Sequence, residues 1–368
     1  MKIRNKTQPC FIDKNQTEGG MKMKRKMIGL LMGTAMAVTM LAGCGGGSSA
    51  ENTEVPEGEA VPTADAGGST EDKTLRVASI HSLNLPYHNW LKTEYEAKAE
   101  EYGFEFTAFN NEQDDSQTVS IIQDCIEQGY DVILFPLTQG DQSDLIQQAR
   151  DAGIAMVSFN LSTDWANGVV TQIVCDEHGL GYASGQQAAK ELPENAKIVI
   201  LEGLAGIDAS TGRRAGYEDG LLAERPDIEV LADSYADFDK AKAMALMDDW
   251  IQAYDQIDGV MAEDDGMALG AYESLVTNGK DTSKVKIYGI NGLAEGCQAV
   301  IDGELSGTVL QSAITFADII FDDLLVPYSN GELDLVNYTE KIEFDAETVD
   351  LERAKELLAY FEEIGMSD

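Results

Sequence analysis

Short apolar runs alternate with longer segments of helical periodicity from residue 74 onward. The run at 74–80 is typical of a strand, and in the segment 89–101 the residues Leu91, Tyr95 and Ala99 recur at helical spacing until Gly103. Further strands are expected at 104–109, 132–135, 155–159 and 171–175, with helices at 116–128 and 143–151. Short strands divided by helices of this length predict a parallel sheet covered on both faces.

The same alternation starts again after residue 175. We expect helices at 180–192, 209–224, 241–254, 267–278 and 293–302, and strands at 197–202, 228–232, 259–262, 285–289 and 307–310. The pattern therefore predicts an α/β fold with two doubly wound parallel-sheet lobes. Open α/β sheets bind ligands beyond the carboxyl ends of their strands, so two facing lobes predict a cleft lined by both sets of strand ends.

The residues before 73 have a different composition. A basic stretch at 23–26 precedes a short apolar run that ends in small residues and Cys44, which resembles a bacterial lipoprotein signal over 21–43 and implies lipid attachment to that thiol. The alternatives are an ordinary secretory signal and an N-terminal membrane anchor with an incidental cysteine. Residues 44–72 predict a disordered tether, since they contain no aromatic residue and no apolar periodicity. We expect residues 1–20 to precede the natural start.

Charge and cysteine content exclude some function classes. The formal net charge of −39, from 65 acidic and 26 basic residues, repels nucleic acid phosphates and anionic lipid headgroups. Cys125, Cys175 and Cys297 stand far apart in apolar contexts and are expected to be buried free thiols. His81 and His88 have no acidic or cysteine residue at metal-ligand spacing, so we expect neither a metal nor a cofactor.

An ordered series of motifs resembles the type I periplasmic sugar-binding proteins, the ribose- and galactose-binding group. The motifs stand at 82–87, 202–217, 236–239, 265–271, 289–292 and 299–303, and the resemblance spans residues 73–352. It implies a clamp that closes about a hinge of three chain crossings, near residues 175–176, 311–312 and 341–342. The N-terminal lobe would then comprise 73–175 and 313–340, and the C-terminal lobe with a terminal helix 176–312 and 341–368.

The resemblance also implies a set of ligand-binding residues, in which aromatic faces stack on a sugar ring and planar polar groups bind its hydroxyls. The set is His81, Tyr87, His88, Asn160, Thr211, Phe238, Asp264, Asn291 and Gln311. Asp265, by contrast, is expected to cap the helix that follows. Two positions depart from the family: Asn160-Leu161 replaces a common Asp-Arg, and Thr211 replaces a second arginine. The loss of two guanidinium groups predicts a less cationic pocket.

These observations favour an extracytoplasmic receptor, monomeric and held to the membrane only by lipid, that delivers a neutral monosaccharide, deoxysugar or polyol to the permease of an ABC importer. A nucleoside or an amino-bearing solute gripped by Asp264 is the alternative ligand, and sensing for a histidine kinase or chemoreceptor is the alternative role. We do not expect an enzyme, because Ser210 and Thr211 have no histidine in the same motif to serve as a base. Related DNA-binding regulators carry a helix-turn-helix where this chain has an export signal.

Overall fold

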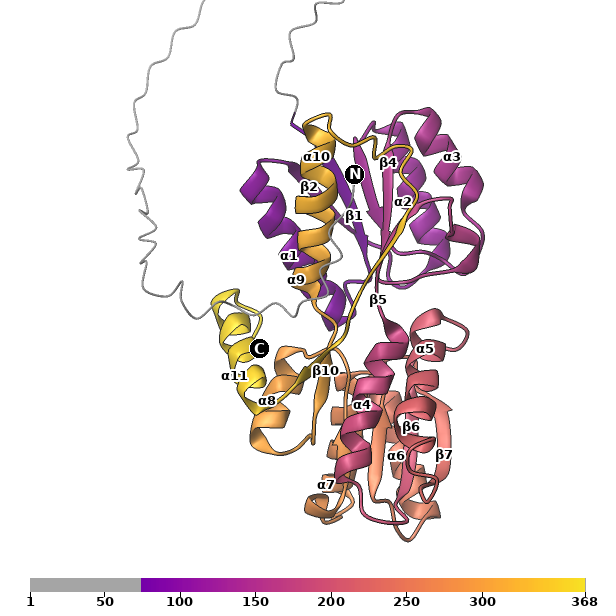
Figure 1. The fold of residues 1–368 in the computed structure, drawn as a ribbon, viewed down its shortest axis with the longest axis vertical. Coiled ribbons are helices and arrows are strands. Elements are labelled where there is room, and N and C mark those ends of the chain that lie inside the picture. The colour runs from indigo at the N-terminus through magenta and orange to yellow at the C-terminus, as the bar shows by residue number, and fades with distance from the viewer. Residues whose placement is uncertain (1–73, 368) are drawn as a thin grey trace, which may run out of the picture. The chain divides into compact units, whose positions relative to one another are not determined.

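The computed structural model describes residues 74–367, which form two α/β lobes (Figure 1). The signal at 21–43, the lipidated Cys44, the tether at 44–72 and the segment 1–20 lie outside the described residues and stay predictions. None of the described helices is both long and apolar enough to cross a membrane. The α/β class and the parallel sheets expected from the sequence are confirmed.

The first lobe is built on a six-stranded sheet in the order β2-β1-β3-β4-β5-β11, with every neighbouring pair parallel. Its strands are β1 (Arg76–His81), β2 (Glu105–Asn110), β3 (Val132–Phe135), β4 (Ala155–Phe159), β5 (Thr171–Cys175) and β11 (Lys341–Phe344). Its helices are α1 (Pro86–Tyr102), α2 (Asp115–Glu127), α3 (Ser143–Asp151), the short turn η1 (Asp164–Ala166), and the continuous run α9 (Ala313–Ala317), η4 (Asp318–Leu325) and α10 (Val326–Ser329).

Successive side chains of a strand point to opposite faces of the sheet. Because the strands are buried on both faces, helices cover both sides of this sheet. In β1, Val77 packs into the apolar cluster that includes α1 and α9, whereas Ala78 and Ile80 pack into the cluster on the side of α2 and α3. Helix α1 buries the expected stripe, including Leu91. It ends at Gly103, whose φ of 70° is the left-handed conformation that glycine adopts without strain.

The second lobe repeats this plan with a parallel sheet in the order β7-β6-β8-β9. Its strands are β6 (Lys197–Glu202), β7 (Glu229–Tyr235), β8 (Gly259–Ala262) and β9 (Lys286–Tyr288), and β10 (Thr308–Leu310) pairs antiparallel with β12 (Glu347–Val349). Its helices are α4 (Glu177–Glu191), α5 (Asp208–Tyr217), η2 (Glu218–Leu222), α6 (Lys240–Ala253), α7 (Asp265–Thr277), η3 (Thr282–Lys284), α8 (Ala294–Asp302) and α11 (Leu351–Glu363). Ala243 and Met247 of α6 are fully buried, as their helical spacing indicates.

Three chain crossings join the lobes. The first follows Cys175, where β5 ends and α4 begins, and the second lies between β10 and α9 at Gln311-Ser312. The third was expected at 341–342, but residues 341–344 form β11 and pair with β5 of the first lobe. The chain therefore stays with the first lobe to Phe344 and crosses just before β12, because the edge of the first sheet offers unpaired backbone groups to a further strand.

Candidate functional site: a cleft between the two lobes

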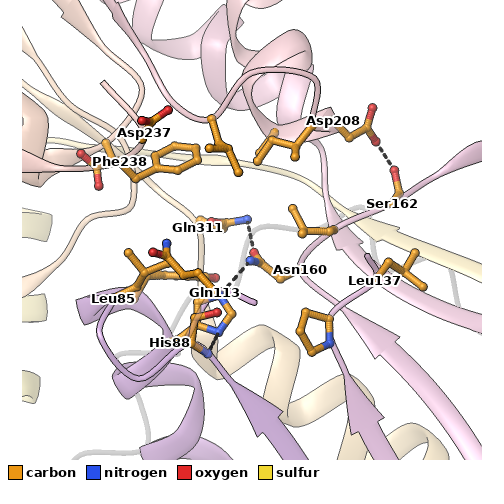
Figure 2. Close-up of a pocket in the computed structure, with 18 of the residues that line it drawn as sticks. Leu85, His88, Gln113, Leu137, Asn160, Ser162, Asp208, Asp237, Phe238 and Gln311 are labelled. Atoms are coloured by element: carbon orange, nitrogen blue, oxygen red, sulfur yellow. Dashed lines mark hydrogen bonds between the residues drawn. The ribbon is translucent and has the colours of Figure 1, made fainter. Parts of the chain in front are cut away.

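A cavity of about 1350 Å³ lies between the two lobes, at the carboxyl ends of both parallel sheets. The segments that follow β1, β2, β3 and β4 line one side, and those that follow β6, β7, β8 and β9 line the other. Figure 2 shows Leu85, His88 and Leu137 from the first lobe opposite Asp208 and Phe238 from the second. A cleft at the switch points of two doubly wound sheets is where this fold class binds small molecules.

Most of the residues expected at the site line this cavity. Those that do are Tyr87, His88, Asn160, Thr211, Phe238, Asp264, Asn291 and Gln311. His81 does not, and its assignment as a contact residue needs correction. Its ring is fully buried at the end of β1, 5.3 Å from the ring of Phe159, and its Nε2 lies 2.7 Å from the hydroxyl of Ser79. His81 therefore packs behind the cleft wall, 6.1 Å from the ring of His88.

Several lining residues have strained backbone. The φ angles are 72° at Asn160, 56° at Asp237, 54° at Phe238 and 114° at Asn291, in the region that non-glycine residues rarely adopt. Rare backbone conformations persist where the surrounding structure fixes them, and they cluster at sites that bind ligands. Gly203 has a related role, because a Cβ there would stand 2.0 Å from the ring of Phe238, so only glycine leaves room for this aromatic wall.

The arginine of the cleft is committed to the protein itself. Arg213 is 3% exposed, and its Nε donates to Glu177 at 2.8 Å while its Nη2 donates to the Oε1 of Gln311 at 3.2 Å. Its Nη1 donates to the backbone oxygen of Glu263, and its guanidinium carbon lies 5.8 Å from the ring centre of Phe238. This arginine links Glu177, just after the first crossing, to Gln311 at the second, and its charge is paired with Glu177.

Glu177 was missed by the sequence analysis. It begins α4 directly after the first crossing, where an acidic residue is common because it favours the helix dipole. In the structure its side chain, only 10% exposed, pairs with Arg213 and also accepts from the Nε2 of Gln311 at 3.2 Å. Burial raises the pKa of Glu177, and the charge of Arg213 opposes that shift. No signal in the sequence separates this role from ordinary helix capping.

Three consecutive acidic residues follow β8, and their roles differ from those expected. Asp264, not Asp265, caps α7, since its Oδ1 accepts from the N–H of Met267 at 2.7 Å. Asp265 is buried and accepts from the hydroxyl of Thr308 at 2.6 Å and from the N–H of Leu293 at 2.9 Å. Asp265 thereby ties α7 to β10 and to the start of α8. The capping role moves one position back because the carboxylate of the N-cap, not that of N1, reaches the free N–H groups.

Burial shifts the pKa values of these three carboxyls upward. It raises the pKa of Glu263 to about 8, that of Asp264 to about 7 and that of Asp265 to about 8. Hydrogen bonds from Gly203, Met267 and Thr308 respectively oppose these shifts. Asp264 is the member of the group that lines the cavity, so a solute meets a carboxyl group whose charge is poorly stabilised by the protein.

The charged groups around the cavity are mostly acidic. The lining carboxylates are Asp115, Asp164, Asp208, Asp237, Asp239, Asp264 and Glu295. Besides Arg213 the lining cations are Lys240 and Lys341, which form ion pairs with Glu273 and Glu343 at 3.0 and 3.2 Å. The expectation of a weakly cationic pocket agrees with this arrangement, which disfavours anionic solutes.

Apolar side chains form a second part of the wall. They are Leu85, Pro86, Pro136, Leu137, Leu161, Leu204, Ile207 and Leu293. None of these residues was expected at the site from the sequence, in which Leu161 stands where the family often has an arginine. Their position in loops just past strand ends was an available signal, since loop positions are ordinarily polar. Trp165 lies at the cavity as well, partly packed on the first-lobe core, and its Nε1 has no partner among residues 74–367.

Four buried polar atoms of cavity-lining residues have no partner within the described part of the chain. They are the Oδ1 of Asn291, the hydroxyl of Tyr87, the hydroxyl of Thr163 and the Nε1 of Trp165. A buried polar atom without a hydrogen bond costs on the order of 1–3 kcal/mol. The arrangement fits a cleft whose polar groups find their partners on a bound molecule.

Comparison with known proteins places this geometry in a family. A family model described as a periplasmic binding protein domain matches residues 77–325. The ribose import binding protein of Escherichia coli (strain K12) is 30% identical over 250 residues, which are 68% of this chain and 82% of that protein. The xylitol-binding protein of Mycolicibacterium smegmatis is 33% identical over 218 residues, which are 59% of this chain and 61% of that protein.

A solved structure shows the same architecture. The ABC transporter solute binding protein from Bacillus halodurans C-125, with bound myo-inositol, superposes with a TM-score of 0.69 at 25% identity, covering 81% of this chain and 99% of that chain. The two doubly wound lobes, the crossings between them and the cleft at the strand ends agree with these matches. This chain therefore belongs to the family of periplasmic binding proteins, with the type I fold that its sequence predicts.

Proposed function

We propose that the protein captures an uncharged carbohydrate or polyol outside the cytoplasmic membrane and delivers it to an ABC importer. The observation that carries this proposal is the cleft itself. It combines an aromatic wall at Phe238, amide side chains at Asn160, Asn291 and Gln311, and an arginine whose charge is paired with Glu177. Amides exchange hydrogen bonds with hydroxyl groups, and aromatic faces cover the C–H face of a sugar ring.

The relatives support the ligand class. They include a ribose import binding protein and a xylitol-binding protein, and the Bacillus halodurans structure holds myo-inositol. The apolar groups Leu85, Leu137 and Leu161 favour a solute that presents an apolar edge on the first-lobe side, as a deoxysugar does. Each of these residues would leave a ligand hydroxyl without a partner, which lowers affinity for a fully hydroxylated hexose.

We propose binding rather than catalysis for this cleft. His88 is the histidine that lines it, and burial lowers the pKa of His88 to about 4. Its Nδ1 accepts from the N–H of Ser82 at 3.1 Å, which leaves no free basic nitrogen to act as a general base. We further propose lipid attachment at Cys44, which would keep a monomeric body on the outer face of the membrane within reach of a permease.

A second ligand class is favoured by one observation. Asp264 lines the cavity without an ion pair in the described part of the chain, and burial raises its pKa to about 7. An ammonium group on the solute would stabilise the ionised carboxylate. An amino-bearing polyol is therefore the alternative to an uncharged one.

A thermal-shift panel on the purified chain separates these candidates. It contains D-ribose, D-allose, xylitol, myo-inositol and glycerol, their deoxy relatives, glucosamine as a cationic sugar and glucose 6-phosphate as an anionic one. A solute that binds only the folded protein raises its melting temperature by mass action. We expect an uncharged member to give the largest rise and the phosphate to give none. A rise with glucosamine alone would establish the amino-bearing class, and a flat panel would refute the carbohydrate assignment.

A further inference from the structure

A series of hydrogen-bonded side chains at the cleft determines which of their atoms donate and which accept. An arginine can only donate, so the group that Arg213 meets at 3.2 Å must be the Oε1 of Gln311. The Nε2 of Gln311 then faces the other way and donates to Glu177 and to the Oδ1 of Asn160, each at 3.2 Å. The amide of Asn160 is thereby oriented as well, and its Nδ2 points toward His88 (Figure 2).

His88 is oriented from its other side. A backbone N–H can only donate, so the Nδ1 of His88, which lies 3.1 Å from the N–H of Ser82, carries the lone pair. Burial lowers the pKa of His88 to about 4, so the ring is neutral near pH 7 and has one N–H group. That N–H group must be on Nε2.

Two donors therefore face each other. The Nε2–H of His88 and the Nδ2 group of Asn160 are 3.4 Å apart, with no lone pair between them. Both residues line the cavity, and His88 is 6% exposed. The backbone of Asn160 is left-handed, with a φ of 72°, a conformation that asparagine tolerates better than most residues.

We propose that His88 and Asn160 form a donor pair that binds one oxygen of the solute purely as an acceptor. The inference rests on the proposed function and specifies its selectivity. A ring oxygen or a carbonyl oxygen satisfies both donors at once, and a hydroxyl does so only with its own proton turned elsewhere. The sequence resemblance leads one to expect an aspartate where this chain has Asn160. A carboxylate there would accept from His88, so the asparagine reverses the polarity of this subsite.

The first experiment needs no solute. Histidine side-chain ¹⁵N spectra of the ligand-free chain should show His88 as the neutral Nε2–H tautomer between pH 6 and pH 8. In Asn160→Asp the new carboxylate accepts from that N–H, which should raise the proton affinity of His88 at least tenfold. Asn167→Asp adds the same charge at the cavity edge, where Asn167 accepts from Gln172, and should leave His88 unchanged. An Nδ1–H tautomer, or equal His88 titration in Asn160→Asp and wild type, overturns the donor pair.

The second experiment uses D-ribose, whose cyclic forms have a ring oxygen, and xylitol, which has only hydroxyl oxygens. We expect D-ribose to bind at least tenfold more tightly than xylitol. His88→Phe, which keeps an aromatic ring but has no donor, should reduce this preference to less than threefold, and Asn167→Asp should preserve it. A preference that survives both His88→Phe and Asn160→Asp overturns the proposal. If neither probe binds the wild type, the proposed ligand class fails, and the tautomer and titration results decide the donor pair independently.

Discussion

The hydroxyl of Ser162 donates a hydrogen bond to the carboxylate of Asp208 across the cleft (Figure 2). Ser162 belongs to the loop after β4 of the first lobe, whereas Asp208 opens α5 of the second lobe. Both residues line the cavity, and neither belongs to a chain crossing. A contact of this kind exists only while the two lobes are close together, so it stabilises the arrangement that surrounds a solute.

Removing this contact should weaken solute binding without affecting the fold. We expect Ser162→Ala to lower the affinity about 1.4- to fivefold, because a solvent-exposed contact to a charged group contributes roughly 0.2–1 kcal/mol. Titration calorimetry with the solute identified by the thermal-shift panel measures the effect. Ser143→Ala is the matched control, since the Ser143 hydroxyl donates to Asp141 within one lobe. Equal affinities for Ser162→Ala and wild type would show that the lobes close without this contact.

The two neighbouring arginines of α5 should differ sharply in their effect on stability. Arg213 is buried and donates in three directions, whereas the side chain of Arg214 is 21% exposed and pairs with Glu218 and Asp233. Arg213→Lys leaves Glu177 without its matched partner and should lower the free energy of unfolding by about 3 kcal/mol. Arg214→Lys should cost less than about 1 kcal/mol. Urea unfolding of both variants measures the difference, and equal losses would contradict a structural role for Arg213.

Much of this architecture could be predicted from the sequence because its strands are buried on both faces. The β3 run Val132–Phe135 and the β8 run Gly259–Ala262 are continuous apolar segments, and their bounds in the structure are those expected. The strand β11 was not predicted. Its residues Lys341–Phe344 alternate charged and apolar at a sheet edge, and only the apolar half is partly buried. This short alternating pattern is equally typical of a connecting loop.

The site was less predictable than the fold, because contact with the cleft depends on how each strand end turns. His81 and His88 looked equivalent in the sequence. Yet His81 still belongs to β1 and points into the core, whereas His88 lies in the first turn of α1 and borders the cavity. The exchange of roles between Asp264 and Asp265 has the same origin, a one-residue difference in where α7 begins. Local sequence patterns do not determine a helix start to that precision.

The buried carboxyl of Glu263 should make stability depend on pH. Burial raises its pKa to about 8 in the folded protein, so the folded state keeps a proton that the unfolded chain releases near pH 4. The stabilisation is therefore complete below about pH 4 and is lost as the pH rises toward 8. Glu263→Gln does not titrate, and its melting temperature should fall less than that of the wild type between pH 5 and pH 8. Differential scanning calorimetry across this range measures both slopes. Glu127→Gln, an exposed change on α2, should keep the wild-type slope, and the same slope in Glu263→Gln would refute the assignment.

The two roles of Asp264 can be separated by choosing the replacement. Serine also caps a helix, so Asp264→Ser should retain the bond to the N–H of Met267, whereas Asp264→Ala loses it and about 1 kcal/mol of stability. Neither variant has a carboxylate for the solute, so both should bind the solute from the panel at least tenfold more weakly. Asp114→Ser exchanges the same residues at the cap of α2, outside the cavity, and should change neither quantity greatly. Urea unfolding and calorimetric titration of these variants give the two measurements. Wild-type affinity in Asp264→Ser would mean that Asp264 serves only as a cap and that the solute is held by its neighbours.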